Sequence, residues 1–327
     1  MNKPPILLIG KTGQIGAELQ RSLSHLGHVF APERRDMDLS NANEVHLFIR
    51  ETRPHLIVNA AAYTAVDAAE NDESNAYALN TYAPALLAEE AKRLNALLVH
   101  YSTDYVFDGL KQSPYGETDQ TNPLNVYGKS KLGGEQAIRA TGASYLILRT
   151  AWIYANRGRN FLLTVLRLAT ERDELKIVHD QIGSPTCAMD IASATGKILA
   201  EIYRQNAGRG FTSSLGGTYH MTAAGQTTWY DFAKAILQKA HEISTHTEWF
   251  AAATRGRPVI ARRIVPISSE EFQSPARRPE YSVLSNSLLS RTFGVALPNW
   301  ITQLQSCFAT ARFHDAQSER SSACNGS

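Results

Sequence analysis

The sequence predicts an α/β protein built on a doubly wound parallel sheet, followed by a smaller C-terminal α/β domain. Two observations support this fold class. In the first half, short apolar segments alternate with longer segments whose apolar residues recur every three or four positions, which is typical of alternating strands and helices. The first apolar segment also leads directly into three evenly spaced glycines, as at a strand-to-helix turn of such a sheet.

Five segments in the first half are expected to be strands. They span residues 6–9, 28–30, 56–59, 97–102 and 145–149. The third and fourth contain continuous apolar runs, which are typical of strands covered on both faces. Helices between them are indicated by two apolar stripes, formed by Ile15, Leu19, Leu23 and Leu26 and by Leu79, Leu86, Leu87 and Leu94.

The pattern becomes less regular after Trp152. Helices are expected over 160–170, 189–203 and 228–241, and the stretch 206–217 is expected to be a loop. We therefore expect a first domain over residues 1–154 and a smaller one over 155–312, with segments of the second returning to the first. Residues 313–327 are rich in Ser, Asn and charge and are expected to form a disordered tail.

Composition excludes several functional classes. The chain has 33 Lys and Arg against 31 Asp and Glu, and no basic run is long enough to indicate a nucleic-acid surface. No apolar run is long enough to span a membrane, and the N-terminal apolar segment is too short for a signal peptide. Cys187, Cys307 and Cys324 have no metal-binding spacing and form no even disulfide set. A cytoplasmic protein without nucleic-acid or membrane partners is expected.

Arginines gather in the C-terminal part of the chain without forming a continuous run. They are Arg255, Arg257, Arg262, Arg263, Arg277 and Arg278. A solvated surface is one interpretation of this group. Contact with a diphosphate is the other, because guanidinium groups bind phosphate oxygens in pairs.

Directly after the first expected strand, Gly10, Gly13 and Gly16 open the first expected helix. Glycines at this place let backbone amides approach a pyrophosphate, which the helix dipole also attracts. A packing turn is the alternative, but the position favours dinucleotide binding. We therefore interpret 1–154 as a dinucleotide-binding domain and 155–312 as mainly a substrate-binding domain.

The end of the second expected strand should meet the adenosine ribose of the dinucleotide. Glu33 could accept hydrogen bonds from the ribose hydroxyls, which would favour NADH, whereas Arg34 or Arg35 could pair with a 2′-phosphate and favour NADPH. The sequence leaves the two cofactors open. Asp38 and Leu39 would lie near the adenine, unless they only begin the next helix.

Two Tyr-x-x-x-Lys spacings occur in the chain, Tyr127 with Lys131 and Tyr230 with Lys234. On a helix, residues four apart share one face, and an ammonium beside a phenol favours the phenolate. Tyrosine ordinarily titrates near ~10, so such a pair could provide a proton donor at neutral pH. The spacing alone identifies neither pair, and context must decide.

Context favours Tyr127 and Lys131. They follow the fourth expected strand, and Thr103 stands at its end, where its hydroxyl could contact the same substrate oxygen. The other pair lies in an apolar helical stripe that begins at Trp229, which we interpret as ordinary core.

Several sequence blocks occur in the order found in a known family. They are residues 10–16, 59–67, 102–107, 123–131, 149–154, 180–186, 225–229 and 278–279. Through these blocks the chain resembles the extended short-chain dehydrogenase/reductases, and within them the dTDP-4-dehydrorhamnose reductases, over nearly all of its length except the tail. The resemblance implies a Rossmann fold. It also implies NAD(P)H-dependent reduction of the C4 ketone of dTDP-4-dehydro-L-rhamnose to dTDP-L-rhamnose, a nucleotide sugar used for polysaccharide.

The resemblance also implies functions for individual positions. The implied catalytic residues are Thr103, Tyr127 and Lys131. The implied cofactor contacts are Gly10, Gly13, Gln14, Ile15, Gly16, Glu33, Asp38, Leu39, Ala62, Tyr63, Thr64, Tyr101, Tyr127 and Lys131. The implied substrate contacts are Thr103, Asp104, Trp152, Asn160 and Arg278. Trp152 could instead belong to the core, and Ala62 could simply fit a tight connection.

Some members of the family bind Mg²⁺ at a subunit interface through acidic side chains, which implies a candidate metal site and a candidate homodimer here. Glu18 and Asp190 are the available ligands. Met189 stands at one of the acidic positions, so one of the oxygen ligands that Mg²⁺ prefers is missing.

Two alternatives stay open. The first is a nucleotide-sugar epimerase or 4,6-dehydratase of the same fold. Related dehydratases follow the strand-end Thr with Asp and Glu, whereas this chain has Asp104 and Tyr105. The second is a non-catalytic protein that resembles the regulatory subunit of methionine adenosyltransferase, against which the intact Tyr127 and Lys131 argue.

Overall fold

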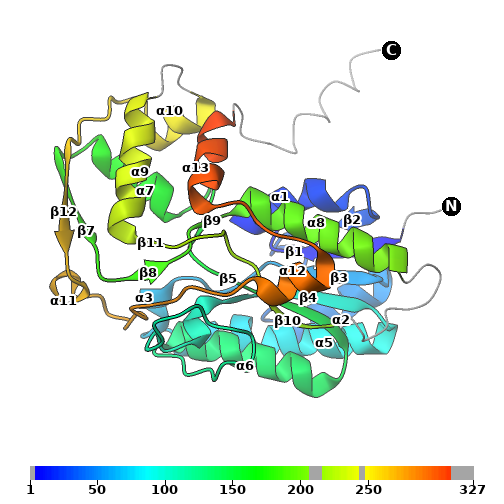
Figure 1. Ribbon diagram of the computed structural model, residues 1–327. Coiled ribbons are helices and arrows are strands. Elements are labelled where there is room, and N and C mark those ends of the chain that lie inside the picture. The colour runs from blue at the N-terminus through cyan, green and yellow to red at the C-terminus, as the bar shows by residue number, and fades with distance from the viewer. Residues whose placement is uncertain (1–3, 206–215, 243–246, 311–327) are drawn as a thin grey trace, which may run out of the picture.

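The computed structural model describes residues 4–205, 216–242 and 247–310. A six-stranded parallel sheet forms the centre of the larger lobe, in the order β2-β1-β3-β4-β5-β10 (Figure 1). The strands are β1 (Pro5–Ile9), β2 (His28–Phe30), β3 (Leu56–Asn59), β4 (Leu97–Thr103), β5 (Ser144–Thr150) and β10 (Gly217–His220). The strand order reverses between β1 and β3, so the carboxyl edge beside these strands is the expected ligand position.

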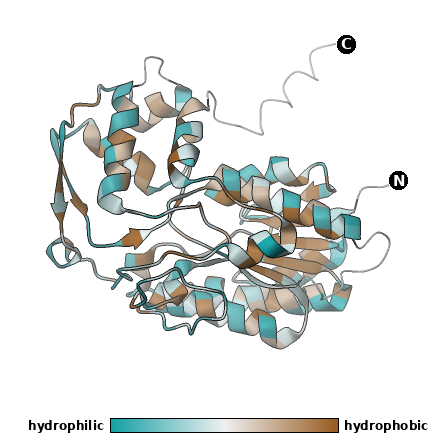
Figure 2. Ribbon diagram, in the orientation of Figure 1, coloured by the Kyte–Doolittle hydropathy of each residue, from teal (hydrophilic) through white to brown (hydrophobic). Residues whose placement is uncertain are grey.

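Alternate side chains of the strands enter two hydrophobic cores, one on each face of the sheet. Ile6 and Leu8 pack in the core of α1 (Gln14–Leu23), α8 (Ala188–Gln205) and α12 (Ser287–Phe293). Leu7 and Ile9 pack in the core of α2 (Ala42–Thr52), α5 (Ala83–Leu94) and α6 (Val126–Thr141). In Figure 1, α1 and α8 lie above the sheet and α5 and α6 below it. Figure 2 shows the apolar strands enclosed between these layers. The prediction of a doubly wound sheet is confirmed.

A smaller helical lobe packs around a core of its own, which includes Leu162, Phe232 and Phe308. Its helices are α7 (Phe161–Ala169), α9 (Trp229–Glu242), α10 (Glu248–Thr254) and α13 (Trp300–Ala309). Strands β7 (Glu174–Val178) and β12 (Arg263–Ile267) form a parallel ribbon beside them, which leads into α11 (Ser269–Phe272). The short pairs are β6 (Ile153–Tyr154) with β9 (Thr186–Cys187) and β8 (Ile182–Gly183) with β11 (Thr227–Thr228).

Three short helical segments complete the larger lobe between β3 and α6. They are α3 (Val66–Ala69), α4 (Glu73–Tyr77), and a π-helix, η1 (Ala78–Tyr82), that joins α4 to α5. The 3₁₀ turn η2 (Asp104–Val106) follows β4 directly. Asn125 then caps α6 by accepting a hydrogen bond from the Gly128 N–H at 2.8 Å. This cap begins the helix two residues before Tyr127.

The five strands and three helices expected from the sequence are observed, and each begins and ends within two residues of its expected bounds. One expectation is partly wrong. Gly217 belongs to β10, which pairs with β5, whereas the sequence indicated a loop there. Residues 206–215 of that expected loop and the expected tail over 313–327 lie outside the described residues.

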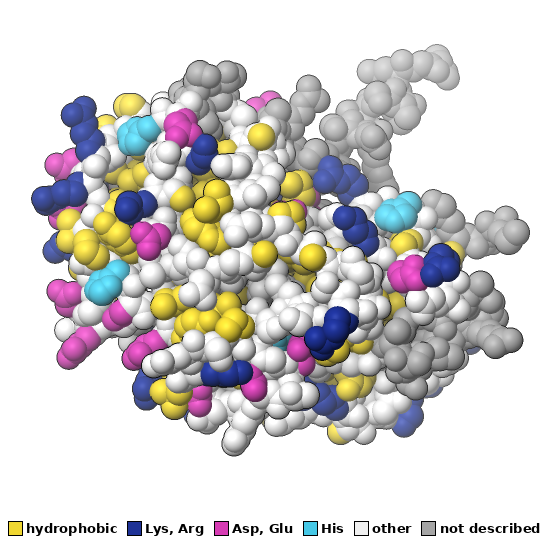
Figure 3. Space-filling model, in the orientation of Figure 1, with side chains coloured by type: hydrophobic (Ala, Val, Ile, Leu, Met, Phe, Trp, Pro, Cys, Tyr) yellow, Lys and Arg dark blue, Asp and Glu magenta, His cyan; other side chains and the backbone are white. Residues whose placement is uncertain are grey.

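In the described residues, no helix combines the length and apolarity needed to cross a membrane. Figure 3 shows Lys and Arg side chains interspersed with Asp and Glu on the visible face. This mixture agrees with the small net charge of +2. No charge of one sign dominates this face.

Candidate active site

The glycine loop between β1 and α1 packs tightly against the connection that follows β3. Gly10 has φ = +86°, and a Cβ atom there would lie 2.7 Å from the backbone nitrogen of Ala61. A Cβ atom on Gly16 would lie 2.0 Å from the Gly10 carbonyl oxygen, which already accepts the Gly13 N–H at 3.0 Å. Side chains are therefore excluded at Gly10 and Gly16. The N-terminus of α1, at Gln14, lies at the carboxyl edge of the sheet, where it suits a pyrophosphate.

A cavity of about 200 Å³ adjoins this loop. It brings together five residues that the sequence analysis assigned to the cofactor, namely Gly10, Glu33, Asp38, Leu39 and Ala62. The connections that follow β1 and β3 thus meet the end of β2 at this cavity, as expected for an adenosine site in this fold. The residues that line the cavity fit a dinucleotide.

Glu33 lies between two cations at the mouth of this cavity. Its carboxylate is 3.2 Å from Lys11 Nζ and 3.3 Å from Arg35 Nε. Arg34, which also lines the cavity, pairs with Asp38 at 3.1 Å. The loop therefore offers both an acceptor for ribose hydroxyls and cations for a 2′-phosphate.

Asp38 is held in one orientation by its neighbours. The backbone N–H and the hydroxyl of Ser40 donate to Asp38 Oδ1 at 2.9 and 2.7 Å. These bonds lower the pKa of Asp38, so it is ionised at neutral pH. Asp38 thus both forms the turn before α2 and lines the cavity, so its place in the turn does not exclude the predicted contact with the adenine.

Thr103 and Tyr127 meet at the carboxyl edge. Thr103 ends β4, Tyr127 lies in the first turn of α6, and the Thr103 side chain lies near enough to lower the pKa of Tyr127. Tyr105 packs its ring against Tyr127 with centroids 5.8 Å apart. A Cβ atom on Gly128 would lie 2.3 Å from the Tyr105 carbonyl oxygen, which explains a glycine inside α6. The short residue lets the helix approach the strand end.

Desolvation raises the pKa of Tyr127 to about 12, the hydrogen bond with Thr103 opposes this shift, and the charge of Asp104 adds to it. The expectation that Lys131 lowers this pKa is not met, because desolvation dominates and the ammonium is bound elsewhere. At neutral pH Tyr127 therefore carries its proton.

Lys131 is 1% exposed and donates to the Tyr101 carbonyl oxygen at 2.7 Å. Its Nζ also lies 3.1 Å from His100 Nε2, and His100 in turn contacts Asn59. Burial lowers the pKa of Lys131 to about 8, although the carboxylate of Glu135 opposes this. The Tyr101 hydroxyl points elsewhere, to Thr195 at 2.7 Å. Tyr101 thus holds Lys131 through its backbone.

Asp104 is 2% exposed, and one of its carboxylate oxygens has no hydrogen-bond partner among the described residues. The other oxygen accepts from Thr103 Oγ1 at 3.0 Å. Burial raises the pKa of Asp104 to about 6, against the hydrogen bonds from Ser282 and Thr103. Such an orphaned buried oxygen is expected where a polar ligand binds.

Asn80 connects the cofactor side of the site to α6, a function that the sequence analysis missed. It lies in the π-helix, is fully buried, and bonds to both backbone groups of Tyr63 at 2.9 and 3.0 Å. Its Nδ2 also donates to Ser130 Oγ at 3.0 Å. Tyr63 is further tied to Asp72 at 3.0 Å, whereas Thr64 is exposed. π-Helical turns often occur at functional sites.

Trp152 has a backbone φ of +47°, which is rare for a bulky residue. Its ring stacks on Trp229 with centroids 3.5 Å apart and an interplanar angle of 5°. Gly183 packs beneath it, since a Cβ atom there would lie 2.4 Å from the ring. The interpretation of Trp229 as ordinary core is therefore incomplete, because this ring is only half-buried and forms a wall with Trp152.

Asn160 and Arg278 each contact the larger lobe. Asn160 caps α7 and donates to Gln14 Oε1 at 2.9 Å, so it joins the smaller lobe to the glycine loop. Arg278 donates to Asp67 Oδ2 at 2.8 Å and to the Ala276 carbonyl oxygen at 3.1 Å. Both residues thus tie segments of the smaller half of the chain to the larger lobe. Ile15, by contrast, is buried in the core.

Glu18 and Asp190 do not form a convincing Mg²⁺ site. The described residues contain no group of three or more His, Cys, Asp or Glu side chains arranged to hold a metal. The cavity beside Glu18 is lined by Cys187, Cys307 and Met189, whose soft sulfur atoms do not suit Mg²⁺. Both cysteines are free and buried. The residues present therefore do not fit this metal.

The second Tyr-x-x-x-Lys pair has a different environment. Lys234 is exposed on α9, and its ammonium lies 5.5 Å from the centroid of the Tyr230 ring. The nearest strand-end hydroxyl, that of Thr228 at the end of β11, bonds to Asp231 at the start of α9. Its geometry is that of a surface cation–π contact.

The site combines a strand-end threonine with a helical Tyr-x-x-x-Lys, and a glycine loop lies where the strand order reverses. Together these features define a Rossmann-fold protein of the short-chain dehydrogenase/reductase class. A family model described as the RmlD substrate binding domain matches residues 4–313. The dTDP-4-dehydrorhamnose reductase of Burkholderia thailandensis is 50% identical over 295 residues, which cover 90% of this chain and 95% of that protein. The chain belongs to the dTDP-4-dehydrorhamnose reductase family.

Solved structures agree with this assignment. The crystal structure of a dTDP-4-dehydrorhamnose reductase from Clostridium acetobutylicum has a TM-score of 0.81 and 36% identity, covering 93% of this chain and 98% of that one. The enzyme of the same name from Bacillus anthracis, in complex with NADP, has a TM-score of 0.81 and 33% identity. That match covers 94% of this chain and 99% of the other.

Proposed function

We propose that this protein reduces the C4 ketone of dTDP-4-dehydro-L-rhamnose to dTDP-L-rhamnose, using NADPH or NADH. The observation that carries the proposal is the meeting of Thr103, Tyr127 and the buried Lys131 at the carboxyl edge of the sheet. The cavity beside the glycine loop adjoins the same edge. Family membership supplies the substrate class, since the relatives are named as reductases of this sugar nucleotide.

The bound nicotinamide supplies hydride to the C4 carbon, and negative charge then develops on the ketone oxygen. Tyr127 gives its phenolic proton to that oxygen, and a pKa of about 12 keeps the proton available at neutral pH. The Thr103 hydroxyl, which donates to Asp104 Oδ1 at 3.0 Å in the structure, turns to donate a hydrogen bond to the same oxygen. Lys131 holds the nicotinamide ribose.

Substrate binding is assigned to residues around this centre. Asp104, with its unpaired oxygen, accepts a sugar hydroxyl, and Trp152 packs against the sugar. Asn160 and Arg278 are assigned to the nucleotide–diphosphate arm, Arg278 in addition to its bond with Asp67. The cofactor is assigned to the glycine loop, to the adenosine cavity beside it, and to the residues 62–64 and 101.

Tyr105 argues against a 4,6-dehydratase. Elimination of water requires a base next to the strand-end acid. Burial raises the pKa of Tyr105, the charge of Asp104 raises it further, and its hydroxyl therefore stays protonated. Reduction needs no such base, so it is the chemistry that this pair of residues favours.

The direct test is consumption of NADPH or NADH with dTDP-4-dehydro-L-rhamnose, followed by identification of the product. We expect turnover and dTDP-L-rhamnose as the product. Absence of oxidation with any 4-keto sugar nucleotide, together with copurification of a partner enzyme, would instead support the regulatory alternative. A tightly bound, non-exchanging cofactor would support an epimerase. Sedimentation of the purified protein tests the predicted homodimer separately.

Coenzyme preference should depend on Glu33. Glu33→Ala removes the carboxylate that neutralises Lys11 and Arg35 and that would repel a 2′-phosphate. We expect the ratio of kcat/KM for NADPH over NADH to rise about 10-fold or more, since charged hydrogen bonds of this kind contribute about 1.5–3 kcal/mol. Steady-state kinetics with both cofactors measure the ratio. Glu51→Ala, which removes the same charge from the exposed side of α2, should leave it unchanged.

A further inference from the structure

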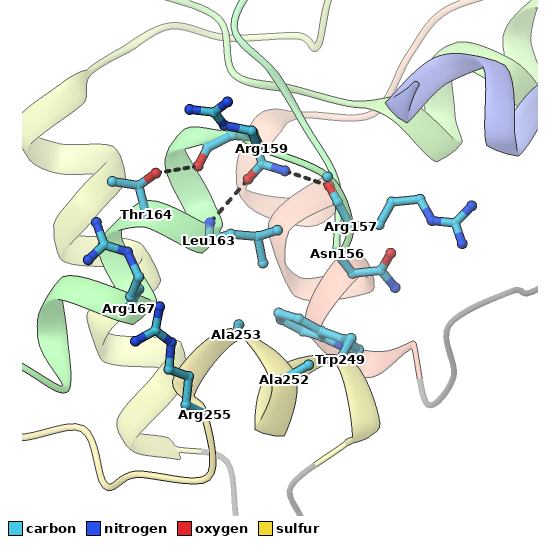
Figure 4. Close-up of a pocket in the computed structure, with 12 residues that line it drawn as sticks. Asn156, Arg157, Arg159, Leu163, Thr164, Arg167, Trp249, Ala252, Ala253 and Arg255 are labelled. Carbon is cyan, nitrogen blue, oxygen red and sulfur yellow. Dashed lines mark hydrogen bonds between the residues drawn. The ribbon is translucent and has the colours of Figure 1, made fainter. Parts of the chain in front are cut away.

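A second cavity, of about 490 Å³, lies between α7, α10 and the segment 156–160 (Figure 4). Its volume is within the range of small-molecule sites. None of Thr103, Tyr127 or Lys131 lines it. Of the residues assigned to the cofactor or the substrate, only Asn160 lines it, so the rest of the lining requires a separate explanation.

The lining is strongly basic. It contains Arg157, Arg159, Arg167 and Arg255, and none of its described residues is Asp or Glu. Figure 4 shows Arg159, Arg167 and Arg255 along one rim of the cavity together with Thr164, whereas Arg157 points away on the other side. Arg167 also pairs with Glu171 at 3.0 Å, outside the cavity lining.

Three guanidinium groups on one rim repel one another unless an anion lies between them. Arg159 and Arg255 are exposed, so their charge faces solvent, and Arg167 is held beside them by α7. Guanidinium groups bind phosphate oxygens in pairs and with high geometric specificity. The Thr164 hydroxyl, which donates to the Asn160 carbonyl oxygen at 2.8 Å, adds a polar group on the same rim.

Part of the cavity lining is apolar. It includes Leu163, Ala252 and Ala253, which present small or aliphatic groups to the space. Figure 4 shows Leu163 beside Thr164, and Ala253 near Arg255. A ligand with several negative charges at one end and a less polar body is therefore complementary to the lining.

The helix α7 separates this cavity from the active site. Leu163, Thr164 and Arg167 share one face of the helix and line the cavity. Phe161 points about a quarter-turn away, where its ring contacts Trp229 at a centroid distance of 4.5 Å. Trp229 in turn stacks on Trp152. The cavity and the tryptophan wall thus lie on different sides of α7.

One contact connects the cavity to the cofactor loop. Asn160 Nδ2 donates both to the Arg157 carbonyl oxygen at 3.0 Å and to Gln14 Oε1 at 2.9 Å. Gly158 has φ = +74°, and a Cβ atom there would lie 3.3 Å from Gln14 Cγ. A ligand on Arg159 would therefore order a segment that contacts the start of α1.

We propose that the rim formed by Arg159, Arg167 and Arg255 binds a di- or triphosphate group, at a site distinct from the active site. The group comes either from a free polyphosphate or from a nucleotide. Because segment 156–160 contacts Gln14, occupancy of this site changes the KM for the nicotinamide cofactor more than it changes kcat.

The test is calorimetric titration of inorganic tripolyphosphate into the protein saturated with NADPH, which occupies the glycine loop. We expect one site per chain and an affinity that falls with added salt. Arg159→Ala/Arg255→Ala should weaken binding by about 10- to 100-fold, because it removes two charge-assisted contacts. The matched control is Arg172→Ala/Arg262→Ala, which removes two exposed arginines that do not line the cavity and should change affinity less than about 2-fold.

A parallel titration with GTP distinguishes the two sources. Tighter binding of GTP than of tripolyphosphate, lost in the same double variant, assigns the site to a nucleotide. Equal affinity, lost in the same way, assigns it to free polyphosphate. Either a lack of saturable binding by the parent protein or an equal loss in the control variant would overturn the proposal. These binding measurements do not require the reductase activity, so failure of the proposed function would be seen separately.

Discussion

Replacing Tyr127 with Phe is expected to lower kcat with dTDP-4-dehydro-L-rhamnose by about 10²- to 10⁴-fold, the usual contribution of a positioned proton donor. The ring and its edge contact with Tyr105 are retained in this variant, so the helix α6 should keep its place. Only the phenolic hydroxyl is lost. Single-turnover kinetics measure the chemical step directly.

Cofactor affinity should change little in the Tyr127→Phe variant, because the adenosine cavity and Lys131 are untouched. Fluorescence titration with NADPH checks this point and excludes misfolding. The matched control is Tyr230→Phe, which removes a phenol from the other Tyr-x-x-x-Lys pair on α9. We expect its kcat to stay within about 2-fold of the parent value. Near-normal turnover in Tyr127→Phe would remove Tyr127 from the mechanism.

The elements that the sequence predicted well are those whose signal is local. Strand β3 begins with three consecutive apolar residues and is buried along its length, so its bounds could be predicted without knowledge of its neighbours. The glycine loop was equally clear, since Gly10 has a positive φ and Gly16 is required by a backbone contact within the same strand-to-helix turn. Tyr127 and Thr103 could be associated because the carboxyl ends of parallel strands face the same side of the sheet.

The features that the sequence did not predict depend on residues far apart in the chain. Strand β10 is short and joins the sheet only by pairing with β5, more than sixty residues earlier. Asn80 holds the Tyr63 backbone through a π-helical turn that leaves no pattern in the sequence. Likewise, the raised pKa of Tyr127 arises from burial, which spacing along a helix does not reveal.

Glu135 provides the second large expected effect, on stability. Its carboxylate is fully buried and accepts from Arg149 Nε and Nη2 at 2.8 and 2.7 Å and from Ser102 Oγ at 2.6 Å. These bonds join α6 to β4 and β5 directly behind Thr103. Glu135→Leu leaves Arg149, itself only 2% exposed, as an uncompensated buried charge. We expect the free energy of unfolding to fall by about 3–5 kcal/mol, measured by urea denaturation.

Arg139 offers a matched comparison, because it pairs with the same carboxylate at 2.6 Å but is 35% exposed. Arg139→Ala should cost less than about 1 kcal/mol, since water replaces the lost partner and screens the charge. Equal losses for Glu135→Leu and Arg139→Ala would contradict the argument that burial of Arg149 causes the effect.

The double variant Glu135→Leu/Arg149→Met separates loss of the ion pair from loss of packing. Replacing both buried charges with apolar side chains is often neutral or stabilising, so much of the stability lost in Glu135→Leu should return.

The pH dependence of stability provides an independent check. Burial raises the pKa of Glu135, but the hydrogen bonds and charge of Arg149 lower it by more, so the net pKa is below its ordinary value. The pair therefore stabilises the fold above about pH 4.3 and loses this contribution as pH falls through the folded-state pKa. The difference in stability between the parent protein and Glu135→Leu should shrink over that acidic range, whereas the double variant should show no such dependence.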